Sequence, residues 1–199
     1  ISLVQFGVLE IHPWGARTDN IERPDRLYFD LDPGPEVNWE QVIQAARELR
    51  ALLDELGLES FVKTSGGKGL HVIVPIARRC DWNQARAFTE AVAQRLSRAA
   101  PQRYLATMSK SRRPGKIFID YFRNARGATA VAPYSTRARP GAPVSTPLAW
   151  NELSPEIGPA IYTVKNIPQR LAKLKRDPWE RLFVTRQTIS ARVAAQLQL

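Results

Sequence analysis

Four apolar runs with the character of β-strands alternate with two helical segments, and this order limits the folds open to the chain. In chain order, the expected strands and helices span residues 27–32, 39–56, 60–64, 70–75, 82–99 and 116–122. Asn38 stands three residues before Gln41, which is the spacing of a capping box at the start of a helix. Asp81 and Gln84 repeat this spacing before the second helix. A strand–helix–strand–strand–helix–strand order predicts an α+β fold in which helices cover one face of a sheet.

The segments that flank these elements carry weaker patterns. In chain order we expect a short strand at 8–12, a polar loop at 16–25, a short strand at 128–135, an extended proline-containing segment from 140 and two helices within 168–199. Asp177-Pro178 separates the two tail helices, because proline cannot donate a backbone hydrogen bond. The tail residues expected to pack against the rest of the domain are Leu171, Leu174, Trp179, Leu182 and Phe183.

The composition is that of an ordinary globular chain. Apolar residues make up 44% and charged residues 24% of the 199 residues. No apolar run approaches the roughly 20 residues that a membrane helix requires, so no membrane span is expected. The single cysteine, Cys80, allows no internal disulfide and indicates a reducing compartment. The chain begins at Ile1 without a signal-peptide pattern, and we expect it to be a fragment of a longer protein.

The positive charge is concentrated in one segment. Residues 103–143 contain nine basic residues and one acid, Asp120, a net charge of +8 out of +10 for the whole chain. Such an uneven segment predicts a polyanionic partner, either a nucleic acid backbone or a nucleoside triphosphate. A solvated basic face is the alternative. The residues expected to contact DNA are Lys110, Arg112, Arg113 and Lys116.

Two carboxylates at the end of the first predicted strand are candidate metal ligands. Side chains alternate along a strand, so Asp30 and Asp32 share a face while Leu31 turns into the core. Two carboxylates held this close repel each other unless a cation such as Mg²⁺ or Mn²⁺ lies between them. Asp120 also ends an apolar run, and if the two strands are neighbours, three carboxylates converge on a two-metal site. A structural acid pair, and an Asp120 that only pairs with arginines, are the alternatives.

The turn Ser65-Gly66-Gly67-Lys68-Gly69 is a candidate phosphate-binding loop. Glycines let backbone N–H groups approach an anion, and Ser65 and Lys68 add a hydroxyl and a charge. The segment does not match a P-loop, and a plain hairpin turn is the alternative. His71, beyond the turn, should share a strand face with Ile73. Further candidates, each with a packing or surface role as the alternative, are His12, Arg137 and Arg139.

Four segments occur in the order found in a known family. They are Gly7-Val8-Leu9-Glu10-Ile11-His12-Pro13-Trp14-Gly15, Phe29-Asp30-Leu31-Asp32-Pro33, Thr64-Ser65-Gly66-Gly67-Lys68-Gly69-Leu70-His71-Val72 and Lys116-Ile117-Phe118-Ile119-Asp120-Tyr121. Together they resemble the polymerase domain of bacterial ligase D, a member of the archaeo-eukaryotic primase superfamily. The resemblance implies a primase-polymerase core, with a mainly antiparallel sheet and packed helices in an RRM-like unit, followed by C-terminal helices. It also implies one domain over residues 1–199 that lacks its N-terminal part, with a catalytic core at 7–139 and an extended segment and helices at 140–199.

The resemblance further implies a template-directed nucleotidyltransferase that fills gaps and extends ends in non-homologous end joining. By the same resemblance, two ions of Mn²⁺ or Mg²⁺ are held by Asp30, Asp32 and Asp120. The incoming NTP or dNTP is held by His12, Ser65, Lys68, His71, Arg137 and Arg139. The implied partners are primer–template, gapped or broken DNA ends, Ku, and the ligase and nuclease domains of the parent protein. The implied location is the bacterial cytoplasm, in association with the nucleoid.

Two other functions remain open from the sequence. A phosphatase of the haloacid dehalogenase type also has an acid-x-acid strand end, but a threonine usually follows there, whereas Pro33 and Gly34 follow here. A basic DNA-binding repair module without catalysis would not depend on Asp30, Asp32 or Asp120. A polymerase requires the three carboxylates for nucleotide transfer, whereas neither alternative transfers nucleotides.

Overall fold

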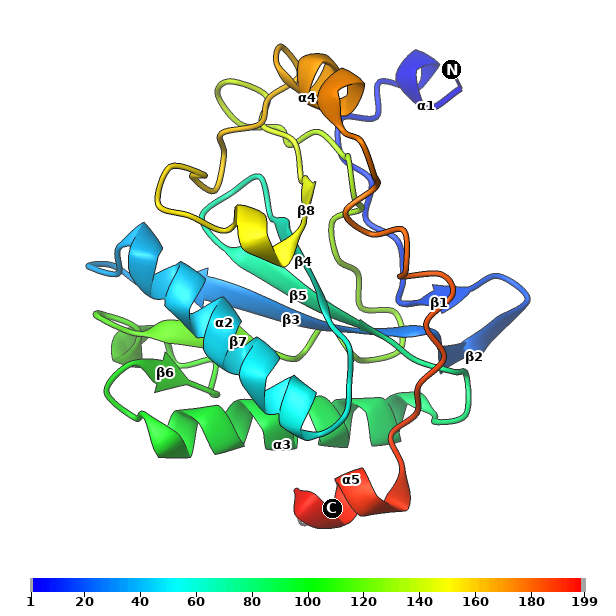
Figure 1. Cartoon of the computed structure of the whole chain (residues 1–199), viewed down its shortest axis with the longest axis vertical. Helices are drawn as coiled ribbons and strands as arrows, with labels where there is room; N and C mark the ends of the chain where they lie inside the picture. The colour runs from blue at the N-terminus through cyan, green and yellow to red at the C-terminus, as the bar shows by residue number, and fades with distance from the viewer. Residues whose placement is uncertain (1, 198–199) are drawn as a thin grey trace.

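A six-stranded sheet forms the centre of the chain in the computed structural model, which describes residues 2–197 (Figure 1). The strand order is β6-β7-β3-β5-β4-β8, and all neighbours are antiparallel except β6 and β7. In chain order the strands are β3 (Arg26–Pro33), β4 (Phe61–Thr64), β5 (Leu70–Pro75), β6 (Tyr104–Leu105), β7 (Ile117–Asp120) and β8 (Pro147–Leu148). The predicted α+β fold with a mainly antiparallel sheet is therefore confirmed.

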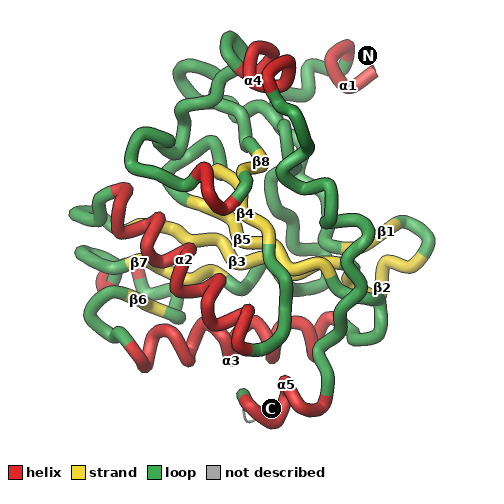
Figure 2. The backbone as a smooth tube through the Cα atoms, in the orientation of Figure 1, coloured by secondary structure: helices red, strands yellow, loops and turns green. Residues whose placement is uncertain are grey.

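Two long helices, α2 (Trp39–Glu55) and α3 (Trp82–Ala99), cover one face of this sheet. Each begins with the predicted capping box, which satisfies free N–H groups of the first turn. Apolar side chains from both helices and from β3, β5 and β7 form a single buried cluster. The tube view in Figure 2 shows the two helices on the same side of the strands, as the sequence order predicts.

The opposite face of the sheet carries the polar side chains. Along β3, Leu27, Phe29 and Leu31 enter the core beneath the helices, so the alternation turns Asp30 and Asp32 to the other face. A smaller apolar cluster covers part of that face and is made of Tyr28, Phe61, Ile73, Ala130, Trp179 and Leu182. His71 precedes Ile73 by two positions on β5 and shares its face, as predicted. The candidate site residues of three strands therefore lie on one surface.

Two predicted strands are absent from the described residues. Residues 8–12 and 128–135 lie beside each other without forming strands, and the Ala132 N–H donates a hydrogen bond to the Ile11 carbonyl. Just beyond residue 12, Trp14 forms a single bridge with Thr129. Pro13 and Pro133 fall within or beside these segments and cannot donate to a strand ladder. The prediction of strands there is wrong, although the two segments are neighbours.

Further short elements depart from the predictions. The expected loop at 16–25 forms a hairpin of β1 (Ala16–Arg17) and β2 (Asn20–Pro24), and the expected crossing segment contributes β8 to the sheet edge. The remaining helices are α1 (Ser2–Gln5), α4 (Ile167–Lys173), α5 (Ala191–Gln196) and two 3-10 turns at Lys110–Arg112 and Trp150–Glu152.

The two tail helices, α4 and α5, are present but short. A long non-helical connection separates them, in place of a break at Asp177-Pro178 alone. Within this connection Trp179 is buried and its indole N–H donates to the Val62 carbonyl at 3.0 Å. Leu182 is buried as well, but Leu171 and Phe183 are exposed, so the packing prediction is wrong for those two residues. The predicted tail extends to residue 199, and residues 198–199 lie outside the described part. No helix within residues 2–197 has the length and apolar character that a membrane crossing requires.

Candidate active site

The pairing of β3 with β7 brings the predicted carboxylates together. Asp30 is directly opposite Asp120 in the antiparallel register, and Asp32 lies two positions further along the same face of β3. Arg123 connects the facing pair, with its Nη2 3.2 Å from Asp120 Oδ2 and 3.8 Å from Asp30 Oδ2. Arg113 lies at the third carboxylate, with its Nη1 2.9 Å from Asp32 Oδ2. Three carboxylates and two guanidinium groups thus share one small area of the sheet.

The surroundings of Asp30 and Asp120 disfavour the ionised form of both carboxyl groups. Burial and the neighbouring charge of Asp120 raise the pKa of Asp30 to about 7. Burial also raises the pKa of Asp120, although Arg123 opposes this rise. Both shifts come first from burial, which disfavours the charged carboxylates, and a nearby cation would offset this cost. A group of this kind attracts cations.

The donor chemistry fits a hard divalent cation. Carboxylate oxygens are the ligands that Mg²⁺ and Mn²⁺ prefer, and all three acids lie on the same face. Within residues 2–197, however, no three His, Cys, Asp or Glu side chains are close enough to hold a metal ion as they stand. In the structure Arg113 and Arg123 are paired with the carboxylates. The metal role of the three aspartates therefore stays a prediction.

The row of polar residues continues across the sheet beyond β3. His71 is opposite Asp30 on β5, and Lys63 is opposite His71 on β4. The Nε2 of His71 lies 3.5 Å from Asp30 Oδ1, while its Nδ1 is buried without a hydrogen-bond partner in the described chain. Burial and neighbouring positive charges hold the pKa of His71 well below its ordinary value, so the ring is neutral. Four adjacent strands thus contribute one polar residue each.

Lys63 was not among the candidate residues from the sequence. Its side chain is fully buried, and Nζ donates to Ser145 Oγ at 2.5 Å. Burial lowers the pKa of Lys63 to about 7, against an opposing attraction from Asp30. The only signal in the sequence is its position on a predicted strand, two residues from Phe61 and therefore on the same face. That position becomes informative only when the register with His71 is known.

Replacing Lys63 by methionine is expected to stabilise the fold at pH 7, by about 1 kcal/mol or more. The folded state disfavours the ammonium, so its cost is complete below about pH 7 and disappears as the pH approaches the unfolded value of 10.5. The gain of Lys63→Met should therefore shrink between pH 7 and pH 10. Thermal unfolding of both proteins over this range measures it. Lys110→Met, at an exposed position, is the control, and a gain that does not vary with pH would contradict the burial effect.

The glycine-rich turn joins β4 to β5 as a tight hairpin. The hydroxyl oxygen of Ser65 accepts hydrogen bonds from the N–H groups of Gly67, at 3.2 Å, and Gly69, at 3.3 Å. Gly66 has a φ of +65°, and a Cβ there would lie 2.8 Å from the Arg137 side chain. The turn is thus a hairpin that the Arg137 side chain approaches closely at Gly66, and its phosphate-binding role stays a prediction. Lys68 at its tip is exposed.

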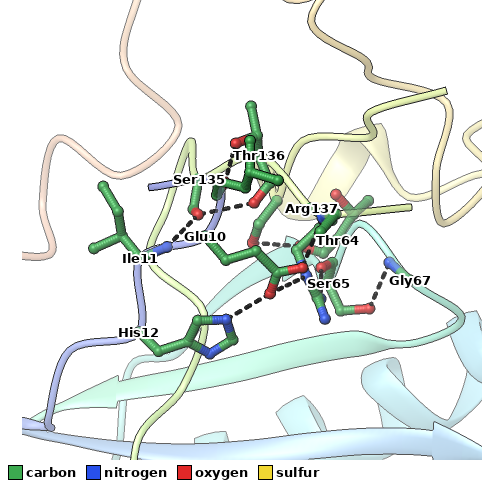
Figure 3. A network of polar contacts seen from close by, with 12 residues as sticks. Glu10, Ile11, His12, Thr64, Ser65, Gly67, Ser135, Thr136 and Arg137 are labelled. Atoms are coloured by element: carbon green, nitrogen blue, oxygen red, sulfur yellow. Dashed lines mark hydrogen bonds and ion pairs between the residues drawn. The ribbon is translucent and has the colours of Figure 1, made fainter. Parts of the chain in front are cut away.

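A second cluster forms around Arg137 beside this turn. Its Nη1 donates to the Ser65 carbonyl at 2.6 Å, and its Nε donates to Glu10 Oε2 at 3.1 Å. Glu10 also accepts a 2.6 Å hydrogen bond from His12 Nε2 (Figure 3). The Arg139 guanidinium approaches the turn at Gly67. His12, Ser65, Arg137 and Arg139 are therefore brought together, and Glu10, which the sequence reasoning passed over, connects two of them.

The four residues predicted to contact DNA lie in different surroundings in the structure. Lys110 and Arg112 are exposed on the 3-10 turn. Arg113 instead turns toward Asp32 and stacks over the Phe118 ring at 4.4 Å, so it belongs to the carboxylate area. Lys116 donates to the Pro101 carbonyl, next to the end of α3. A DNA-binding role for these four residues stays a prediction.

Comparison with known proteins finds similarity to one family. The family model described as the LigD primase-polymerase domain matches residues 1–179. The multifunctional non-homologous end joining protein LigD of Pseudomonas aeruginosa is 46% identical over 198 residues, which are 99% of this chain and 24% of that protein. The LigD protein of Mycolicibacterium smegmatis is 41% identical over 158 residues, which are 78% of this chain and 21% of that protein. The chain spans about a quarter of the length of these relatives.

A solved structure has the same fold. The polymerase domain of Mycobacterium tuberculosis Ligase D, in complex with DNA, matches with a TM-score of 0.82 and 36% sequence identity. The match covers 92% of this chain and 66% of that chain. The sheet and the helices that position the carboxylates are therefore shared with a polymerase domain that binds DNA.

Proposed function

Because the chain belongs to the family of LigD primase-polymerase domains, which are nucleotidyltransferases, we propose that it extends DNA ends and fills gaps in bacterial non-homologous end joining. The observation that carries the proposal is the position of the three carboxylates beside the basic cluster at Arg137. Acids that attract cations and guanidinium groups that attract phosphates are the two components of a nucleotidyl-transfer site. The family membership inferred from the sequence motifs is confirmed by the comparisons, which do not favour the phosphatase or the non-catalytic module.

In this proposal Asp30, Asp32 and Asp120 hold two ions of Mn²⁺ or Mg²⁺. Such ions, when bound, supply activation of the primer 3′-hydroxyl and neutralisation of the pyrophosphate that leaves. Arg113 and Arg123 would exchange their present carboxylate contacts for substrate phosphates, since a guanidinium binds either anion. His71 is neutral, and its Nδ1, which has no hydrogen-bond partner among residues 2–197, offers a further polar contact at the edge of the acidic area.

The incoming NTP or dNTP is assigned to the cluster beside the glycine-rich turn. Its triphosphate would contact, in this assignment, His12, Ser65, Lys68, His71, Arg137 and Arg139. The DNA backbone is assigned to Lys110, Arg112, Arg113 and Lys116. From the resemblance of the sequence motifs, the proposal also includes Ku and the ligase and nuclease domains of a longer parent protein as partners, in the bacterial cytoplasm near the nucleoid. The name of the Pseudomonas aeruginosa relative, a multifunctional non-homologous end joining protein, supports a role in end joining.

Primer extension on a gapped duplex tests the proposed function. With Mn²⁺ and NTPs or dNTPs, the chain should add the nucleotide that the template specifies. Addition of a chelator should abolish extension, and fresh Mn²⁺ should restore it, because the metal supplies the charge that the carboxylates require. A chain that binds DNA without extending it under any of these conditions would favour the non-catalytic alternative. Release of phosphate from a simple phosphomonoester would favour the phosphatase.

A further inference from the structure

The carboxylate of Glu10 is a junction of three hydrogen bonds. Oε2 accepts from His12 Nε2 at 2.6 Å and from Arg137 Nε at 3.1 Å, and Oε1 accepts from the Ala138 N–H at 2.7 Å. Figure 3 shows the carboxylate between the imidazole and the guanidinium, near the Ser65 turn. Two segments more than a hundred residues apart in the sequence are joined at this one group.

The backbone on either side of Glu10 is held as well. The Ile11 N–H donates to Ser135 Oγ at 2.9 Å, and the Thr136 hydroxyl donates to the Leu9 carbonyl (Figure 3). The carboxylate therefore projects from a segment that is fixed against residues 135–136. A charged group on a fixed backbone can set the position of flexible side chains around it.

Glu10 is ionised at neutral pH. Burial would raise its pKa, but the hydrogen bonds from His12, Ala138 and Arg137 outweigh burial and lower the pKa to about 2. An ionised carboxylate can only accept hydrogen bonds, so His12 must carry its proton on Nε2. The Nδ1 atom of His12 is then the one left for another partner.

Arg137 is fixed at two of its three guanidinium nitrogens. Nε is bound to Glu10, and Nη1 is bound to the Ser65 carbonyl at 2.6 Å. Nη2 makes no hydrogen bond to the part of the chain that the structure describes. A guanidinium held in this way presents its remaining donor in one direction, which reduces the conformational entropy lost when an anion binds.

We propose that Glu10 is a positioning residue that orients His12 and Arg137 for the incoming triphosphate. This inference rests on the proposed function. Glu10 itself does not contact the phosphates, because its negative charge would repel them. The alternative is that Glu10 competes with the nucleotide, because its carboxylate occupies the place of a phosphate oxygen beside Arg137. The second anchor of Arg137 on Ser65 favours positioning, because it keeps the guanidinium beside the turn and not only beside Glu10.

The test compares Glu10→Gln with the parent protein in primer extension opposite a template thymine, with ATP as the nucleotide and Mn²⁺ present. Glutamine keeps the size of the side chain but loses the charge that three donors share. The KM for ATP should rise about tenfold, while kcat and the Kd for DNA change by less than about threefold, since no transition-state contact is removed. Arg137→Ala should raise the KM at least as much. In the Arg137→Ala background, Glu10→Gln should add less than it does alone.

Glu22→Gln is the matched control, because Glu22 forms a similar pair with Arg126 at an exposed position on β2 and makes no hydrogen bond to His12 or Arg137 in the described chain. An unchanged KM for ATP in Glu10→Gln would overturn the inference, and a lowered KM would assign the competitor role instead. Glu10→Ala is a second variant with the same expected direction, and thermal unfolding of each variant verifies that it is folded. If the parent protein itself neither binds ATP nor extends DNA, the proposed function fails. If the parent is active and Glu10→Gln equals it, only the positioning role fails.

Discussion

Replacing Asp30 or Asp120 by alanine is expected to reduce primer extension at least about 100-fold, equivalent to ~2.7 kcal/mol of transition-state stabilisation. The two carboxylates face each other across β3 and β7, so each variant removes half of the closest pair of oxygen donors. Extension rates at saturating nucleotide and Mn²⁺ measure the loss. Added Mn²⁺ should not restore activity, because the ligand itself is missing.

Loss of activity in these variants should not come from loss of folding. The pKa of Asp30 is raised to about 7 by burial and by Asp120, so its charge destabilises the metal-free fold at neutral pH. Asp30→Ala should therefore unfold at the same temperature as the parent protein or at a higher one. Asp54→Ala, which removes an exposed acid on α2, is the control for both measurements. Extension by Asp30→Ala and Asp120→Ala at the parent rate would exclude the aspartates as metal ligands.

Gly69→Ala is expected to destabilise the fold by about 3 kcal/mol and to abolish primer extension. A Cβ at this position would lie 2.0 Å from the Leu31 carbonyl oxygen and 3.4 Å from Pro33 Cδ. Leu31 separates Asp30 from Asp32, and β3 is held between β5 and β7, so the strand has no room to move away. The variant would displace both carboxylates. Chemical denaturation and the extension assay measure the two effects.

Gly158→Ala provides the comparison for this substitution. No atom lies within 4 Å of a Cβ built on Gly158, so alanine there should leave both stability and extension near the parent values. If Gly69→Ala unfolded at the same denaturant concentration as Gly158→Ala, the close approach of Gly69 to the Leu31 carbonyl would be contradicted. Retention of extension by a destabilised Gly69→Ala would show that the carboxylates tolerate a shift of β3.

The strong local patterns predicted the frame of the molecule. Capping boxes at Asn38 and Asp81 set the starts of both long helices, and alternation along β3 put Asp30 and Asp32 on one face. These features depend on residues a few positions apart, which sequence reasoning can read directly. The convergence of Asp120 on Asp30 followed once β3 and β7 were assumed to be neighbours, and the structure has them paired.

The contacts that complete the site could not be predicted in this way. Lys63 is recognised as part of the site only from the β4–β5 register, which places it opposite His71. Glu10 is recognised only from its contact with Arg137, in a loop more than a hundred residues later in the sequence. The same dependence on distant partners explains the errors at 8–12 and 128–135, where apolar residues suggested strands but the segments meet through a few side-chain and backbone contacts. Arg113 was predicted from the sequence to contact DNA, but in the structure its side chain is paired with Asp32. This contact also depends on a partner far away in the sequence.

The polar row across four strands, Asp120, Asp30, His71 and Lys63, makes the charge change along one direction of the sheet. Acidic side chains lie on β7 and β3, a neutral imidazole on β5 and a buried amine on β4, next to the turn that Arg137 contacts. A substrate with its negative charge gathered at one end is attracted to such a surface in a single orientation, with the charged end toward β4. In the proposed function, the order of the strands would therefore set the orientation of the incoming triphosphate on the sheet, with its charged end toward the turn that Arg137 contacts.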